Sequence, residues 1–111
     1  MQYVGMSRQQ IAGMRQAPFW AGMEAIAPTL AYDHTAIMGP TAGVPKDRLA
    51  KVNVPVLALC GDASYPFMCT TARTIAEAVP SGAYRSLSGQ AHEVQQAVLA
   101  PALIDFFKSD D

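Results

Sequence analysis

The second half of the chain alternates between apolar runs and amphipathic stretches. Residues 54–60, Val-Pro-Val-Leu-Ala-Leu-Cys, are continuously apolar and are followed by a glycine. A run of this kind is typical of a strand covered on both faces, as in a parallel sheet. Residues 83–87 predict a second, shorter strand, and between the two strands we expect a helix capped by Ser64 and ended by Pro80.

A last helix is expected near the C-terminus, with Pro101 in its first turn. Its apolar positions are Val98, Leu99, Ala102, Leu103, Phe106 and Phe107. The order strand, helix, strand, helix predicts an α/β fold in which the two strands are parallel.

The first half predicts short helices separated by prolines. Ser7 and Gln10 have the spacing of a capping box, so a helix is expected from residue 8, and Pro18 suits the first turn of a second one. A third helical piece is expected to close at Gly39. We therefore divide the chain into a helical segment, residues 1–44, and a βαβα part, residues 45–111. Five of the six methionines precede residue 40, which fits either ordinary packing or a lid that faces a substrate.

Composition excludes several classes of protein. Half of the 111 residues are hydrophobic and 15% are charged, which argues against disorder. The net charge is -1 and the basic residues are scattered, so we expect no nucleic-acid partner. We see no apolar run of membrane-spanning length and no signal peptide. The 2 cysteines and 2 histidines predict no zinc site, and we interpret the cysteines as reduced thiols of a cytoplasmic protein.

Two polar loops follow the predicted strands, at residues 61–66 and 88–93. In parallel α/β folds, functional groups lie in the loops that leave the C-terminal ends of the strands. His92 occupies the second loop among small residues, and a histidine in that place is a candidate general acid or base. The alternative is a structural or merely exposed histidine.

The order of these motifs resembles the C-terminal part of the α/β-hydrolase-fold family. The resemblance rests on residues 54–61, the helix that follows, residues 86–92 (Ser-Leu-Ser-Gly-Gln-Ala-His) and the closing Asp105-Phe106-Phe107. It implies that the helical first half is the end of an inserted lid and that no cofactor is used. It also implies that His92 is the general base of a Ser-acid-His triad.

The nucleophile and the acid of that family are not matched. No Gly-x-Ser-x-Gly elbow occurs, and the nearest sequence, residues 5–9, places Ser7 where a helix cap explains it better. The family carries its acid three residues beyond the glycine that ends the first of these strands, a position held here by Ser64. Asp62 is the carboxylate of that loop, and it either orients His92 or is a solvated turn residue. We expect no hydrogen bond between Asp62 and His92.

Two further candidate functional pairs are weaker, because each also has a purely structural explanation. Cys69 near a helix N-terminus suggests a Cys-His pair with His92, or else a small buried hydrophobe. Asp33 and His34 suggest a metal or acid-base pair, but neighbours on a helix point in different directions.

These expectations combine into a function. The chain is interpreted as a C-terminal fragment or truncated relative of a serine hydrolase that acts on an ester or a related small carboxylic substrate. It would supply the general base but not the nucleophile, and it would be inactive alone. The alternative is a non-catalytic, self-associating binding module derived from the same fold. We also expect a homodimer or association with the missing N-terminal half, since a two-stranded sheet is marginal by itself.

Overall fold

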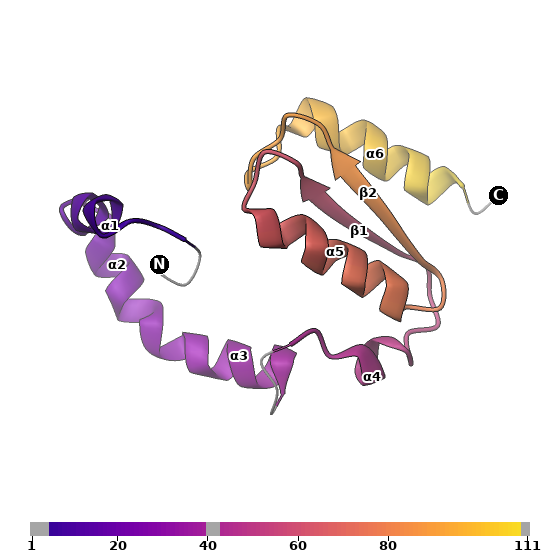
Figure 1. Cartoon of the computed structure of the whole chain (residues 1–111), viewed down its shortest axis with the longest axis horizontal. Helices are drawn as coiled ribbons and strands as arrows, with labels where there is room; N and C mark the ends of the chain where they lie inside the picture. The colour runs from indigo at the N-terminus through magenta and orange to yellow at the C-terminus, as the bar shows by residue number, and fades with distance from the viewer. Residues whose placement is uncertain (1–4, 40–42, 110–111) are drawn as a thin grey trace. The chain divides into compact units, whose positions relative to one another are not determined.

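The computed structural model describes residues 5–39 and 43–109, in two compact units that comprise residues 1–45 and 46–111 (Figure 1). The first unit contains the helices α1 (Arg8–Arg15), α2 (Trp20–Ile26), η2 (Ala27–Thr29, a 3-10 helix) and α3 (Leu30–Met38). The second contains α4 (Lys46–Leu49), β1 (Val56–Gly61), α5 (Pro66–Ala78), β2 (Gly82–Leu87) and α6 (Gln96–Lys108).

The helices of the first unit begin and end where local chemistry predicts, with one shift. The Ser7 side chain accepts from the Gln10 N–H at 3.2 Å, and the Gln10 side chain accepts from the Ser7 N–H at 2.8 Å, which completes the capping box. Gly39, with φ 68°, ends α3. The second helix begins at Trp20 rather than at Pro18, which lies in the turn before it.

Large apolar side chains of the first unit are exposed within that unit. These side chains are Phe19, Ile26, Leu30, Tyr32 and Ile37, each at least 55% exposed. Helices α1, α2 and η2 bury none of their residues. The apolar faces that the sequence pattern predicts therefore form surface, and no buried core residue is found among the described residues of the first unit.

The second unit has the predicted βαβα order and a parallel strand pair. β1 pairs with β2 in parallel, from Val56 opposite Gly82 to Gly61 opposite Leu87. In Figure 1 the two strands run between α5 and α6. The core between the sheet and α5 is made of small side chains, namely Ala58, Cys60, Ala72 and Ala76. Small residues allow close approach, and at Gly82 even one Cβ atom would overlap the Ala76 carbonyl.

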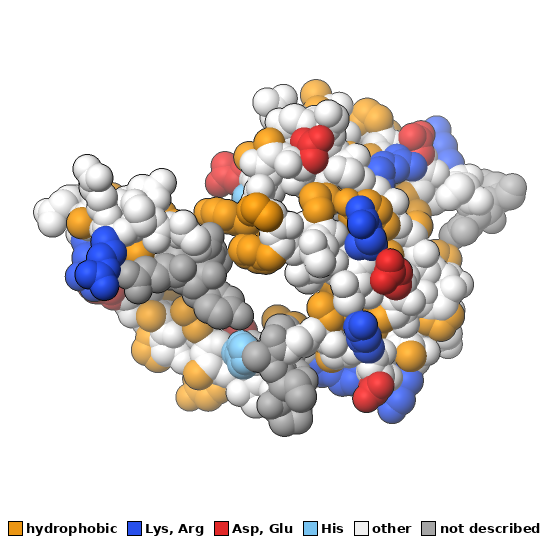
Figure 2. Space-filling model, in the orientation of Figure 1, with side chains coloured by type: hydrophobic (Ala, Val, Ile, Leu, Met, Phe, Trp, Pro, Cys, Tyr) orange, Lys and Arg blue, Asp and Glu red, His pale blue; other side chains and the backbone are white. Residues whose placement is uncertain are grey.

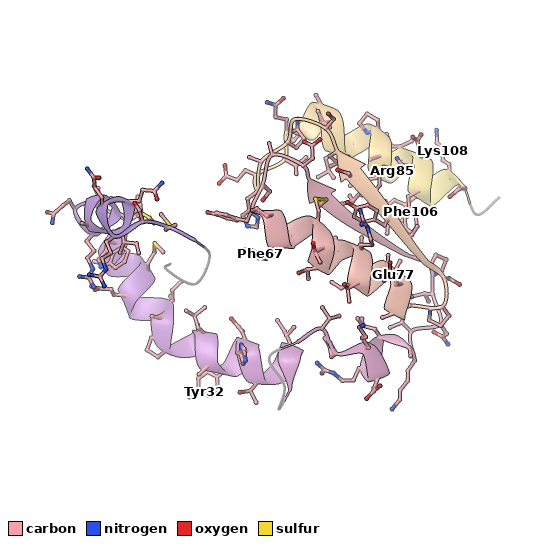
Figure 3. All side chains as sticks on the ribbon, viewed as in Figure 1. Tyr32, Phe67, Glu77, Arg85, Phe106 and Lys108 are labelled. Atoms are coloured by element: carbon pink, nitrogen blue, oxygen red, sulfur yellow. A yellow bond between two sulfur atoms is a disulfide. The ribbon has the colours of Figure 1, made fainter. Side chains whose placement is uncertain are left out.

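Helix α6 is longer than the sequence suggests. It begins at Gln96, so Pro101 lies inside the helix and not in its first turn. Proline removes one backbone donor from the helix interior, a defect that α6 tolerates while burying Ala102 on its inner side. The exposed ends of Arg85 in β2 (labelled in Figure 3) and Asp105 in α6 approach to 3.7 Å.

The sheet has two strands in the described part of the chain, so each strand is an edge. Val54, just before β1, is 57% exposed. Within the described residues, no helix is long and apolar enough to cross a membrane.

Candidate active site

The loops that follow β1 and β2 are joined by three hydrogen bonds. The Asp62 N–H donates to the Leu87 carbonyl at 3.2 Å, and the Ala63 N–H donates to the Gln90 carbonyl at 3.0 Å. The Asp62 carboxylate accepts from the Gly89 N–H at 2.6 Å. Both candidate loops therefore lie at the same edge of the sheet, as the parallel arrangement predicts.

Gly61 lets the two loops come this close. A Cβ atom at this position would overlap the carbonyl oxygens of Gln90 and Ala91. Because both obstacles are backbone atoms, a side chain here can be accommodated only if the loop before His92 moves. Gly61 thus fixes how near the loop of His92 comes to the end of β1.

Substitution Gly61→Ala is expected to displace that loop and to lower the free energy of unfolding by about 1–3 kcal/mol, the usual cost of overpacking. Amide chemical shifts of residues 89–92 and urea unfolding would measure both effects. Gly13→Ala is the control, since nothing lies within 4 Å of a Cβ at that position. Unchanged stability and unchanged loop shifts in Gly61→Ala would show that the loops are not packed as described.

His92 is exposed at the mouth of two hollows. One, of about 230 Å³, has a mainly apolar lining that includes Leu59, Met68 and Leu99. The other, of about 340 Å³, is lined by residues of the loop after β1, including Tyr65. The imidazole is tilted by 50° to the Tyr65 ring, with 6.3 Å between the ring centres. No hydrogen bond or ion pair joins it to residues 5–39 or 43–109.

Aromatic side chains lie near His92 and the hollows that it lines. Tyr65 stacks on Phe67, with ring centres 5.8 Å apart and planes within 7°. The two rings are 37% and 44% exposed. Figure 3 shows Phe67 at the N-terminal end of α5, and Figure 2 shows hydrophobic side chains gathered over the same end. The surface beside His92 is therefore apolar and suits an apolar portion of a small molecule.

Asp62 is not hydrogen-bonded to His92. Among the described residues its carboxylate is hydrogen-bonded only to the Gly89 N–H, three residues before the histidine, and the side chain is otherwise exposed. The structure therefore brings the two candidate residues into adjoining loops without pairing them, in agreement with the expectation of no hydrogen bond.

Ser64 has a different place from the one predicted. It does not cap α5, whose N-cap residue is Tyr65 and has no side-chain cap bond. The Ser64 hydroxyl is instead buried, has no hydrogen-bond partner among the described residues, and lines both hollows with His92. An unpaired buried hydroxyl keeps both its donor and its acceptor capacity free, and this one belongs to a residue that lines the same hollows as His92.

Gln90 is a functional candidate that sequence reasoning missed. It is the buried polar residue of the described chain, 8% exposed. Its side-chain oxygen accepts from the Gln95 N–H at 3.0 Å, at the start of α6. Gln90 thereby fixes the far end of the segment that carries His92. A glutamine in a loop gives no sequence signal for such a role.

The interpretation of both cysteines as reduced thiols is wrong, because Cys60 and Cys69 form a disulfide (the yellow bond in Figure 3). It joins the end of β1 to the first turns of α5. A disulfide sulfur is not a thiolate, so the suggested pair of Cys69 and His92 is also excluded. The cytoplasmic location, which rested on reduced thiols, loses that support. The Tyr84 hydroxyl lies 3.3 Å from the Cys60 sulfur.

The other candidates belong to the first unit. Ser7 caps α1, and Asp33 and His34 are exposed on α3. Within the described residues, no group of three or more His, Cys, Asp or Glu side chains is placed to hold a metal ion.

Comparison with solved structures shows a relationship to one fold family. The chain is 38% identical to an alpha/beta hydrolase from Sphaerobacter thermophilus DSM 20745, over 94% of this chain, and superimposes on it with a TM-score of 0.71. The chain is related to the α/β-hydrolase-fold family. It covers 40% of the Sphaerobacter protein, so its fold is a partial α/β-hydrolase fold. No protein-family model and no curated protein matches the chain.

The relation to α/β hydrolases confirms the resemblance drawn from the motif order. The chain nevertheless departs from that family at the positions of the nucleophile and the acid. No α/β-hydrolase nucleophile elbow is present in the sequence, and the position at which the family resemblance expects the acid carries the unpaired Ser64. Of the three triad members that the family resemblance implies, the sequence offers a candidate for one, His92.

Proposed function

We propose that this chain is the part of an α/β-hydrolase-family serine hydrolase that carries the general base, His92. The observation that supports the proposal most is the place of the imidazole. It stands at the carboxyl edge of the parallel sheet, at the mouth of an apolar hollow, and no described residue occupies its nitrogens. A neutral imidazole has one nitrogen that accepts a proton, as a general base requires.

The chemistry follows from that role. In the complete enzyme, His92 takes the proton of a serine hydroxyl as the serine attacks an ester or related small carboxylic substrate. The acyl-serine is then hydrolysed by a water that His92 activates. The reaction needs no cofactor. The serine and the oxyanion donors come from a further polypeptide segment, because the chain has no nucleophile elbow.

Association with that nucleophile-bearing segment is part of the proposal. β1 has an unpaired edge in the described chain, and such an edge offers a row of backbone donors and acceptors to another strand. The Sphaerobacter protein contains chain beyond the portion matched here, which is the kind of segment that the edge requires.

The test is a chimera in which this chain replaces the matching portion of the Sphaerobacter protein. We expect the chimera to hydrolyse a nitrophenyl ester and to react with a serine-directed phosphonate. We expect the 111-residue chain alone to do neither above the background of a surface imidazole. Rapid stoichiometric labelling of the chain alone would reveal a nucleophile of its own and contradict the proposal, and a folded but inactive chimera would do so too.

A second candidate function is a non-catalytic, self-associating binding module. It is favoured by the absence of a carboxylate on His92 among the described residues and by the exposed apolar side chains of the first unit. A two-fold homodimer would cover the apolar surface and pair the edges of β1.

For that module, thermal stability is expected to rise with protein concentration, because dissociation and unfolding are linked. Light scattering and thermal melts across a concentration series would measure it. The control is Leu57→Lys, since Leu57 lies on β1 and is partly exposed, so a charge there should weaken edge pairing. A cooperatively folding monomer at low micromolar concentration would argue against the dimer.

A further inference from the structure

The carboxylate of Asp62 has a geometry that does not fit a triad acid but fits a different task. Its Oδ1 atom accepts from the Gly89 N–H at 2.6 Å, which is short for an N–H to O bond. Hydrogen bonds to an ionised carboxylate are both shorter and stronger than neutral ones. The acceptor stands on the loop after β1 and the donor on the loop after β2, so the bond joins the two loops directly.

The backbone of Gly89 is suited to receive this bond. Gly89 has φ 69°, in the left-handed region that favours glycine, and nothing lies within 4 Å of a Cβ at that position. Glycine is thus favoured at position 89 because of the positive φ angle, and not because a side chain would meet neighbouring atoms. It aims the N–H out of the end of β2 and toward the neighbouring loop.

The segment that carries His92 is held at both ends. At its start, Asp62 binds Gly89, and the Ala63 N–H binds the Gln90 carbonyl. At its end, the Gln90 side chain binds the Gln95 N–H. The residues from 91 to 94 form a short bridge between these two anchors, and His92 lies within it. Release of one anchor would give the imidazole a larger range of positions.

We propose that Asp62 is a positioning residue that latches the loop of His92 through the Gly89 N–H, instead of orienting the imidazole directly. The role requires an acceptor oxygen at the end of a short side chain and does not require a negative charge next to the imidazole. It concerns this chain by itself, so it holds whether or not the proposed hydrolase activity is correct.

The variants Asp62→Asn and Asp62→Ala separate the two roles. Asparagine keeps the acceptor oxygen and removes the charge, whereas alanine removes both. For a latch, Asp62→Ala should speed hydrogen exchange of the Gly89 amide by roughly tenfold to a hundredfold. It should also shift and broaden the ring-proton signals of His92, and Asp62→Asn should restore most of both. Glu93→Gln, which removes the carboxylate next to His92, is the matched control and should leave the Gly89 amide unchanged.

The wild-type chain supplies a readout that does not depend on how the variants fold. Scalar coupling across the hydrogen bond is expected between the Gly89 ¹⁵N and the Asp62 carboxylate ¹³C, and none between that carbon and a His92 ring nitrogen. Two outcomes would overturn the latch. One is coupling to the imidazole in place of the amide. The other is a Gly89 amide that exchanges as slowly in Asp62→Ala as in the wild type, since the Asp62 carboxylate would then not hold that amide.

Discussion

Replacement His92→Ala in the chimera with the Sphaerobacter protein is expected to lower kcat by roughly four to six orders of magnitude. Loss of the base leaves the serine hydroxyl without a proton acceptor, and what remains is the catalysis due to binding and the oxyanion donors. Initial rates with a nitrophenyl ester would measure the loss. Added imidazole should restore part of the rate, because the space left by the side chain opens to solvent.

The matched control is the second histidine of the sequence. His34 is exposed on α3, in the other unit, and His34→Ala should leave the rate within a factor of about two. A His92→Ala chimera that keeps more than a tenth of the rate would remove His92 from the mechanism. An equal loss in His34→Ala would point to folding as the cause.

The order of the elements could be predicted because each carries a local signal. The apolar run in β1, the capping box of α1 and the glycine after α3 are short-range features that dictate backbone conformation. Errors arose where two signals compete. Proline favours a first helical turn, yet α6 already starts at Gln96 and tolerates the loss of one backbone hydrogen bond at Pro101.

The candidate site was predictable only in outline. Loop position alone placed His92 and Asp62 at one edge of the sheet. The partner of Asp62 is a backbone N–H of a residue 27 positions away, and no residue pattern encodes such a contact. The same holds for Gln90 and for the buried hydroxyl of Ser64, whose roles depend on how closely the two loops approach each other.

The disulfide was missed for a related reason. Cysteine count and spacing do not reveal whether two sulfurs meet; a strand end and the first turns of the next helix bring Cys60 and Cys69 to a Cα separation of 5.1 Å. The prediction of reduced thiols rested on the expected cellular compartment, whereas the local geometry of the two cysteines decides whether a disulfide can form. The bond ties α5 to the strand end at Gly61, where the loop of His92 crosses, so it also supports the candidate site.

Reduction of the Cys60–Cys69 disulfide is expected to lower the free energy of unfolding by about 2–3 kcal/mol. The two cysteines are 9 positions apart, so the bond closes a short loop and removes a limited amount of chain entropy from the unfolded state. For a domain of this size, the loss corresponds to a decrease in Tm of roughly 8–24 °C. Thermal melts with and without a phosphine reductant would measure it.

The control is a variant with both substitutions, Cys60→Ala and Cys69→Ala, whose Tm should not respond to the reductant. Its Tm should lie at or below that of the reduced wild type, because Cys60 is 6% exposed and alanine leaves a small void in the core beside α5. Two results would contradict the assignment: labelling of two free thiols in the denatured, unreduced chain, or identical melts before and after reduction. Either result would mean that the disulfide does not stabilise this unit, and that the packing of small residues between α5 and the sheet accounts for its stability.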